Sequence, residues 1–90
     1  MSASINRITE VSNADADNEG VRRFAVAMKE KLAKKREQGY SGWNHPSYCS
    51  MDRLKLLLAD HVTKGDPVDI SNFCMMIWNR QNPTAYRKKP

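Results

Sequence analysis

The sequence is poor in the residues that build disulfide or zinc scaffolds, since it has only two cysteines among 90 residues. Cys74 falls in an apolar helical pattern and Cys49 in a loop, so both are predicted to be free thiols in a reducing cytoplasm. No apolar run is long enough to span a bilayer, and the first twenty residues contain no apolar core of signal-peptide length. The composition therefore argues against a secreted or membrane-spanning protein and predicts a cytoplasmic one.

Several catalytic and binding motifs are also missing. There is no glycine-rich phosphate loop and no dinucleotide fingerprint. Cys49 and His45 are close in sequence but lack the third member that nucleophilic catalysis requires. A helix-turn-helix over residues 50 to 80 would use "NFCMMIW" as its recognition helix, which is too apolar for a DNA groove, so a nucleic-acid partner is not expected.

What the chain does have is a moderate excess of positive charge. Its 15 Lys and Arg against 10 Asp and Glu give a formal charge of +5, which favours anionic partners in a general way. At this length we expect one domain, over residues 18–81. A flexible segment, residues 1–17, precedes it, and a basic tail, residues 82–90, follows it.

The domain divides into three predicted helices. The first, residues 18 to 38, has apolar residues at spacings of three and four and a basic run in its last turns, and Gly39 ends it. Ser50 caps the second, which runs to about Lys64 and ends at Gly65. The third runs from about residue 66 to 80, so almost no loop separates it from the second.

The predicted fold is therefore all-α, a small three-helix bundle. The third helix is apolar nearly all round from Phe73 to Trp78. Two short helices of one subunit would hardly cover such a helix, so we expect a homo-oligomer with this helix at its centre. The alternative is that the N-terminal segment covers the remaining face.

Two aspartates open the third helix, and two interpretations of them stay open. Asp66 and Asp69 lie on one helical face and could share a divalent cation. The simpler reading is that both stabilise a helix start, with Pro67 at the first helical position. Further metal ligands would have to come from Asp60 or Glu37. His61 could join them, but it lies on the apolar face of the second helix, where a histidine is more often a core residue than a ligand.

The loop "GYSGWNHPSYC" combines stacking rings with hydrogen-bonding side chains, just after a basic helix end. Aromatic rings stack on a nucleobase while cations hold the phosphates, so this neighbourhood suits a nucleotide. In the alternative reading, Trp43 plugs the bundle and the lysines form a solvated face. The predicted ligand-binding residues are Lys35, Arg36, Tyr40, Trp43, Asn44, His45, Asp69 and Asn72.

The stretches "MKEKLAKKREQGYSGW" and "PVDISNFCMMIWNR" together resemble small phage-encoded proteins related to the MazG-like all-α nucleoside triphosphate pyrophosphohydrolases. The resemblance covers about residues 24 to 80 and implies a helical hairpin fold. It also implies magnesium held by paired glutamates on the middle helix and by acidic residues on the next. Where the paired glutamates would be expected, this chain has Leu57, Leu58, Asp60 and His61, and only Asp69 matches the last-helix aspartate.

The leading hypothesis is thus a phage-type, homo-oligomeric protein that binds a nucleotide-derived defence signal without turnover and without a cofactor. Arg36 and Lys35 would meet phosphate, Trp43 or Tyr40 would stack on the base, and Asn44 and Asn72 would read polar edges. One alternative is a magnesium-dependent pyrophosphohydrolase with a reduced acidic site. Another is an inhibitor that binds a host protein.

Overall fold

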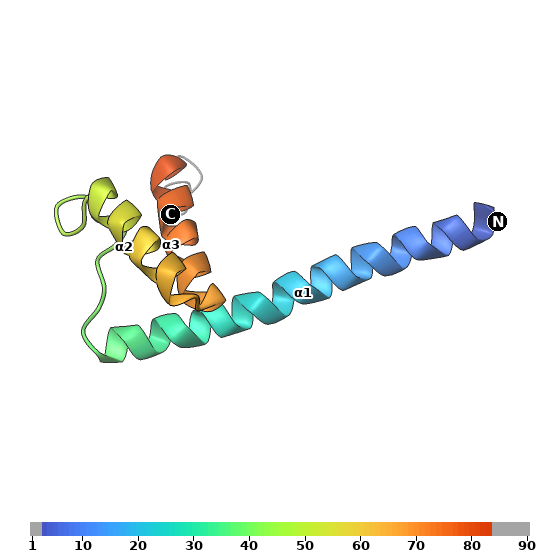
Figure 1. Cartoon of the computed structure of the whole chain (residues 1–90), viewed down its shortest axis with the longest axis horizontal. Helices are drawn as coiled ribbons and strands as arrows, with labels where there is room; N and C mark the ends of the chain where they lie inside the picture. The colour runs from blue at the N-terminus through green and yellow to red at the C-terminus, as the bar shows by residue number, and fades with distance from the viewer. Residues whose placement is uncertain (1–2, 84–90) are drawn as a thin grey trace, which may run out of the picture.

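Three helices make up the fold, as the sequence predicts (Figure 1). The computed structural model describes the backbone of residues 3–83 and the side chains of residues 12–83. Helix α1 is Ala3–Glu37, α2 is Met51–Lys64 and α3 is Pro67–Gln81. No strand occurs in this described part of the chain, which confirms the all-α class.

Helix α1 is longer than the sequence predicts. It begins at Ala3 rather than near residue 18, so it includes the part of the N-terminal segment in which the apolar residues show no sustained period. Its C-terminal end agrees with the prediction: Lys34, Lys35 and Arg36 occupy the last turn, and Gly39 follows with a positive φ of 92°. Residues 1–2 and 84–90, which include most of the predicted basic tail, lie outside the described part.

The caps of α2 and α3 are those the sequence predicts. The Ser50 side chain accepts a hydrogen bond from the Arg53 N–H at 3.0 Å at the start of α2. Gly65 ends α2 with φ of 84°, a left-handed conformation that disfavours any residue with a Cβ. Asp66 then caps α3 by accepting from the Val68 N–H at 2.9 Å, so the chain reverses through only two residues.

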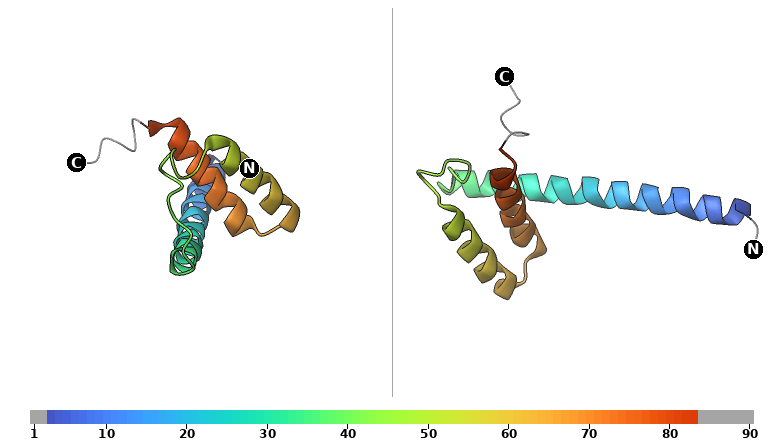
Figure 2. Two further views of the ribbon diagram at one scale, coloured as in Figure 1. Left: turned by 90° about the vertical axis from the view of Figure 1, so that its left-hand side faces the viewer. Right: turned by 90° about the horizontal axis from the view of Figure 1, so that it is seen from above.

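The α2–α3 hairpin packs on the C-terminal half of α1, and α3 is the helix that contacts both others (Figures 1 and 2). The core is thin. Leu54 of α2 and Met76 of α3 are the only buried hydrophobic side chains among residues 12–83, and of the two only Leu54 is fully buried. His61 is a satisfied core residue, as predicted: its Nδ1 lies 2.8 Å from the Leu57 carbonyl oxygen, and its ring lies against Phe73.

The molecule is elongated because α1 extends well past the hairpin (Figure 2). The chain measures 57 × 34 × 23 Å, and its radius of gyration is 17.4 Å. A compact chain of this length would have a radius of gyration of about 12 Å. Residues 12–23 of α1 are all exposed. Among the described residues, no helix combines the length and the apolar character that crossing a membrane requires.

Candidate functional site

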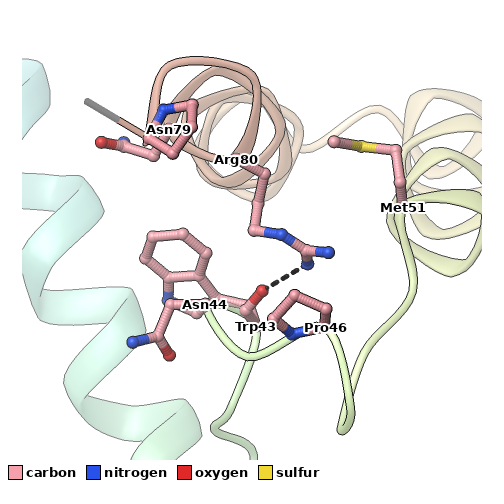
Figure 3. A pocket seen from close by; sticks show the side chains of 7 residues that line it. Trp43, Asn44, Pro46, Met51, Asn79 and Arg80 are labelled. Carbon is pink, nitrogen blue, oxygen red and sulfur yellow. Dashed lines mark hydrogen bonds between the residues drawn. The ribbon is translucent and has the colours of Figure 1, made fainter. Parts of the chain in front are cut away.

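A cavity of about 270 Å³ lies between the loop that follows α1 and the C-terminal end of α3 (Figure 3). Its walls combine flat or apolar groups, among them the Trp43 indole, with the polar ends of three side chains. The two halves of the wall are far apart in sequence, so folding of the loop onto α3 creates the cavity. The lining residues are Trp43, Asn44, Pro46, Met51, Asn79, Arg80 and Pro83.

Arg80 holds this loop in place. Its Nη1 donates to the Trp43 carbonyl oxygen at 2.8 Å and to the Cys49 carbonyl oxygen at 2.9 Å. The loop also needs Gly42, which has a φ of 89° and whose Cβ, if present, would lie 3.3 Å from the Tyr48 Cβ. A charged donor between two carbonyl groups fixes the middle of the loop and its C-terminal end on one side chain.

The polar groups of the cavity favour an anion. The other N–H groups of Arg80 make no hydrogen bond within the described part of the chain, so the guanidinium retains donors for a ligand. Asn79 donates through Nδ2 to the Met75 carbonyl oxygen at 2.9 Å, which leaves its Oδ1 as an acceptor. Among residues 12–83, no carboxylate lines the cavity.

The structure divides the residues predicted for the ligand site among three places. Trp43 and Asn44 line the cavity, and Trp43 is half-buried rather than sealed in the bundle. A second group lies on the loop or at the end of α1, outside the cavity. Tyr40 is 67% exposed, with the Lys35 Nζ 5.5 Å from its ring centroid, and Arg36 beside them is exposed. His45 is exposed and packs edge-on against Tyr48.

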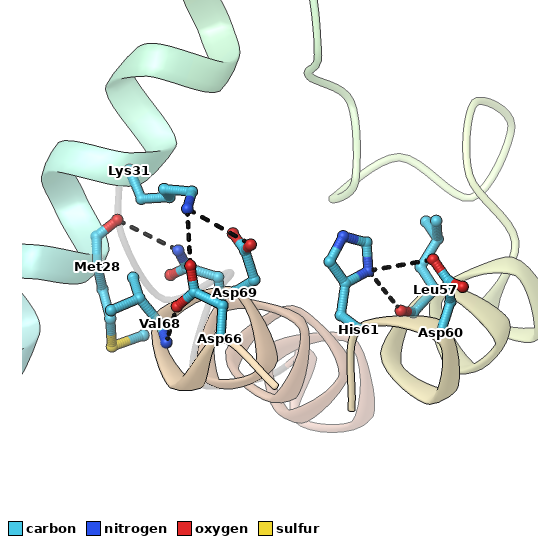
Figure 4. A network of polar contacts seen from close by, with 9 residues as sticks. Met28, Lys31, Leu57, Asp60, His61, Asp66, Val68 and Asp69 are labelled. Atoms are coloured by element: carbon cyan, nitrogen blue, oxygen red, sulfur yellow. Dashed lines mark hydrogen bonds and ion pairs between the residues drawn. The ribbon is translucent and has the colours of Figure 1, made fainter. Parts of the chain in front are cut away.

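Asp69 and Asn72 form the third group, in the N-terminal half of α3. Figure 4 shows Asp69. Asp69 and Arg80 are separated by three helical turns, roughly 16 Å along the axis. Asn72 is 4% exposed and donates through Nδ2 to the Met28 carbonyl oxygen at 3.3 Å, while its Oδ1 has no hydrogen-bond partner among the described residues. Neither residue lines the cavity, so neither belongs to the site described above.

The two aspartates at the start of α3 converge on a lysine of α1. The Lys31 Nζ lies 3.0 Å from an Asp66 oxygen and 3.4 Å from an Asp69 oxygen (Figure 4). The hydrogen bond from Lys31 lowers the pKa of Asp66, and the Val68 N–H adds to the same effect. In turn, the hydrogen bond to Asp66 raises the pKa of Lys31. These ion pairs join α1 to α3.

The same geometry decides how well the acidic residues fit a magnesium ion. The ammonium of Lys31 already lies between Asp66 and Asp69, and its charge repels a divalent cation. Asp60 is on α2 and pairs with Lys64 at 3.1 Å. Within residues 12–83, no three His, Cys, Asp or Glu side chains lie close enough to hold a metal ion. The donor set therefore does not fit a magnesium centre.

Sequence reasoning missed Arg80, Asn79 and Lys31. Arg80 sits in the last turn of α3, where a basic residue is expected for the helix dipole alone. Lys31 is one of several lysines in α1, and no local pattern singles it out. A partial signal was present for Arg80, which follows a long uncharged stretch directly after Trp78 and Asn79.

A scan against known protein families, a search of curated proteins and a search of solved structures found no match.

Proposed function

We propose that this chain is a cytoplasmic, homo-oligomeric protein that binds a nucleotide or a nucleotide-derived small molecule and does not turn it over. The observation that carries the proposal is the cavity in which the Trp43 ring and the Arg80 guanidinium lie together, with no carboxylate among the described residues that line it. A ring offers a stacking surface for a base, and a guanidinium with remaining donors binds a phosphate.

The size of the cavity limits how a ligand would lie in it. Its volume of about 270 Å³ is just below the range of roughly 300–1,000 Å³ that is typical for small-molecule pockets. We therefore place the base or the ribose inside, between Trp43 and the proline rings, and the phosphates at the rim beside Arg80. Asn44 and Asn79 would contact the polar edge of the base.

The position of the acidic residues supports binding without turnover. Asp66 and Asp69 are held by Lys31 near the opposite end of α3 from the cavity. Phosphoanhydride hydrolysis of the MazG-like type needs several carboxylates and magnesium next to the triphosphate. The resemblance to phage-encoded proteins adds the proposal that the ligand is a nucleotide-derived defence signal, which the protein sequesters in the host cytoplasm.

Calorimetry with purified protein tests the proposal. The panel comprises nucleosides, nucleoside mono- and triphosphates, ADP-ribose derivatives and cyclic dinucleotides. We expect at least one phosphorylated compound to bind with a Kd well below 1 mM, and its nucleoside to bind more weakly because it cannot contact Arg80. Trp43→Leu should weaken binding roughly 10-fold or more, since stacking of a base contributes about 1–3 kcal/mol.

Tyr40→Leu is the matched control. Tyr40 is an aromatic residue of the same loop, but it is 67% exposed and lies outside the cavity, so its replacement should leave the affinity unchanged. Two results would overturn the proposal. One is the absence of any ligand in the panel that binds more tightly than 1 mM. The other is release of pyrophosphate from nucleoside triphosphates with magnesium, which would establish the hydrolase alternative.

A further inference from the structure

The chain exposes more surface than a folded monomer of its mass should. Its accessible surface is 7252 Å² for 10.3 kDa. The scaling for monomeric proteins gives about 5,400 Å² at this mass, so the excess is roughly 1,900 Å². Part of this excess is the projecting length of α1, whose residues 12–23 are all exposed. Another part lies on the helical hairpin, where Leu56, Val62 and Trp78 are exposed apolar side chains.

Part of this surface is an apolar face of α3, which we call the Cys74 face. Cys74 is exposed and Trp78 is 56% exposed, and at a spacing of four they lie on the same side of the helix. Ile70, one turn before Cys74, is partly exposed on the edge of this side, and so is Ile77. Helices α1 and α2 both contact α3. Cys74 and Trp78 nevertheless stay exposed, so neither helix covers this face.

The charge pattern of α3 indicates what covers the Cys74 face. No charged residue occurs in α3 between Asp69 and Arg80, although the chain as a whole carries a net charge of +5. A two-fold interface brings the same surface of both copies together, so a charge near its centre would face its own like charge. The Cys74 face is free of this repulsion. An uncharged apolar face on a basic protein suits a second copy better than it suits an anionic partner.

The position of Cys74 within α3 defines the arrangement. Cys74 is the middle residue of the helix Pro67–Gln81. If two α3 helices pack antiparallel about a two-fold axis, Cys74 lies next to Cys74 of the partner subunit. Trp78 then packs on Ile70 of the partner subunit, because each lies one turn from the centre. A small side chain at the centre lets the two helices approach closely.

We propose that two copies of the chain associate through the Cys74 face, with their α3 helices antiparallel. This inference rests on the oligomer part of the proposed function. It specifies the surface through which the subunits associate and sets the number of subunits at two. It does not depend on the nucleotide. The dimer would cover the apolar side of α3 that α1 and α2 leave exposed.

Light scattering combined with cross-linking tests the dimer and its surface separately. In a Cys49→Ser background, a short bismaleimide should join two chains through Cys74, and in a Cys74→Ser background it should join few. Trp78→Lys should weaken the dimer at least 10-fold, because it places a cation against the apolar Ile70 of the partner subunit. Leu56→Lys is the matched control, since Leu56 is 69% exposed on α2, away from the Cys74 face.

Circular dichroism of each variant establishes that it is folded before its mass is compared. The mass of two chains, with cross-linking at Cys74 and sensitivity to Trp78→Lys, supports the inference. If light scattering gives the mass of one chain at all concentrations, both this inference and the oligomer part of the proposed function are wrong. If the protein is an oligomer that neither cross-links at Cys74 nor responds to Trp78→Lys, only the assignment of the interface to the Cys74 face is wrong. Nucleotide binding by calorimetry is measured independently of all three outcomes.

Discussion

Replacing Arg80 by methionine tests whether one side chain holds the loop that forms the cavity. The substitution keeps the length of the apolar stem, so packing of the stem is largely retained. It removes the Nη1 donor that bonds to the carbonyl oxygens of Trp43 and Cys49 at 2.8 and 2.9 Å. We therefore expect the loop to loosen and the free energy of unfolding to fall.

The magnitude follows from the two bonds. A hydrogen bond with a charged partner contributes about 1.5–3 kcal/mol, and we use the lower value for each bond because Arg80 is only partly buried. The expected loss is therefore about 3 kcal/mol, which corresponds to a Tm lower by roughly 12–24 °C in a domain of this size. Since small domains are stable by about 5–15 kcal/mol in total, this is a large effect.

Urea denaturation followed by circular dichroism measures the change. All variants are compared at one protein concentration, because association raises apparent stability. Arg53→Met is the matched control: it removes the same charge from an exposed position on α2 and should change stability by less than about 0.5 kcal/mol. If Arg80→Met lowers the midpoint no more than Arg53→Met does, Arg80 does not hold the loop.

Three further predictions concern the fold. Leu54→Ala should lower the free energy of unfolding by about 2–5 kcal/mol in urea denaturation, because Leu54 is 1% exposed, while Leu56→Ala at an exposed position should change it by less than about 0.5 kcal/mol. The pKa of Asp66 is lowered and that of Lys31 is raised, so their ion pair stabilises the protein between about pH 4 and pH 10. The stability difference between the native chain and Lys31→Met should therefore shrink as the pH falls through the lowered pKa of Asp66, and a constant difference down to pH 2 would contradict this. Gly65→Ala should lower the Tm through about 1 kcal/mol of backbone strain, because φ at this position is 84°. An added Cβ would meet no atom within 4 Å, so the strain would come from the backbone alone. An unchanged Tm would show that the turn relaxes.

The elements of the hairpin were predictable because their signals are local. Ser50, Gly65 and Asp66 act on backbone groups within a few residues of themselves, and each holds the role that its position predicts. The satisfied state of His61 was predictable for the same reason, since its partner is the carbonyl one turn before it. The start of α1 was not, because its first residues carry no apolar period to mark a helix.

The cavity was only half predictable because it joins distant parts of the chain. The aromatic loop identified Trp43, but the interaction between Trp43 and Arg80 depends on how the loop folds back on α3. Spacing placed Asp66 and Asp69 on one helical face, yet it could not show that this face meets α1. The ion pairs of Lys31 with the two aspartates are also contacts between distant parts of the chain, and the spacing of residues along the sequence does not predict such contacts.

The proposed dimer and the proposed ligand site depend on the same last turn of α3. Trp78 of the Cys74 face directly precedes Asn79 and Arg80 of the cavity, and the last turn of an isolated helix frays. Dimer formation would order the turn that the ligand needs, so each event should favour the other. Thermodynamic linkage is reciprocal. If dimer formation raises the affinity for the nucleotide by some factor, the nucleotide raises the affinity between the two subunits by the same factor, typically about 5–150-fold. Trp78→Lys should thus weaken nucleotide binding although Trp78 does not line the cavity. Unchanged affinity in a monomeric Trp78→Lys protein would show that the two sites are energetically independent.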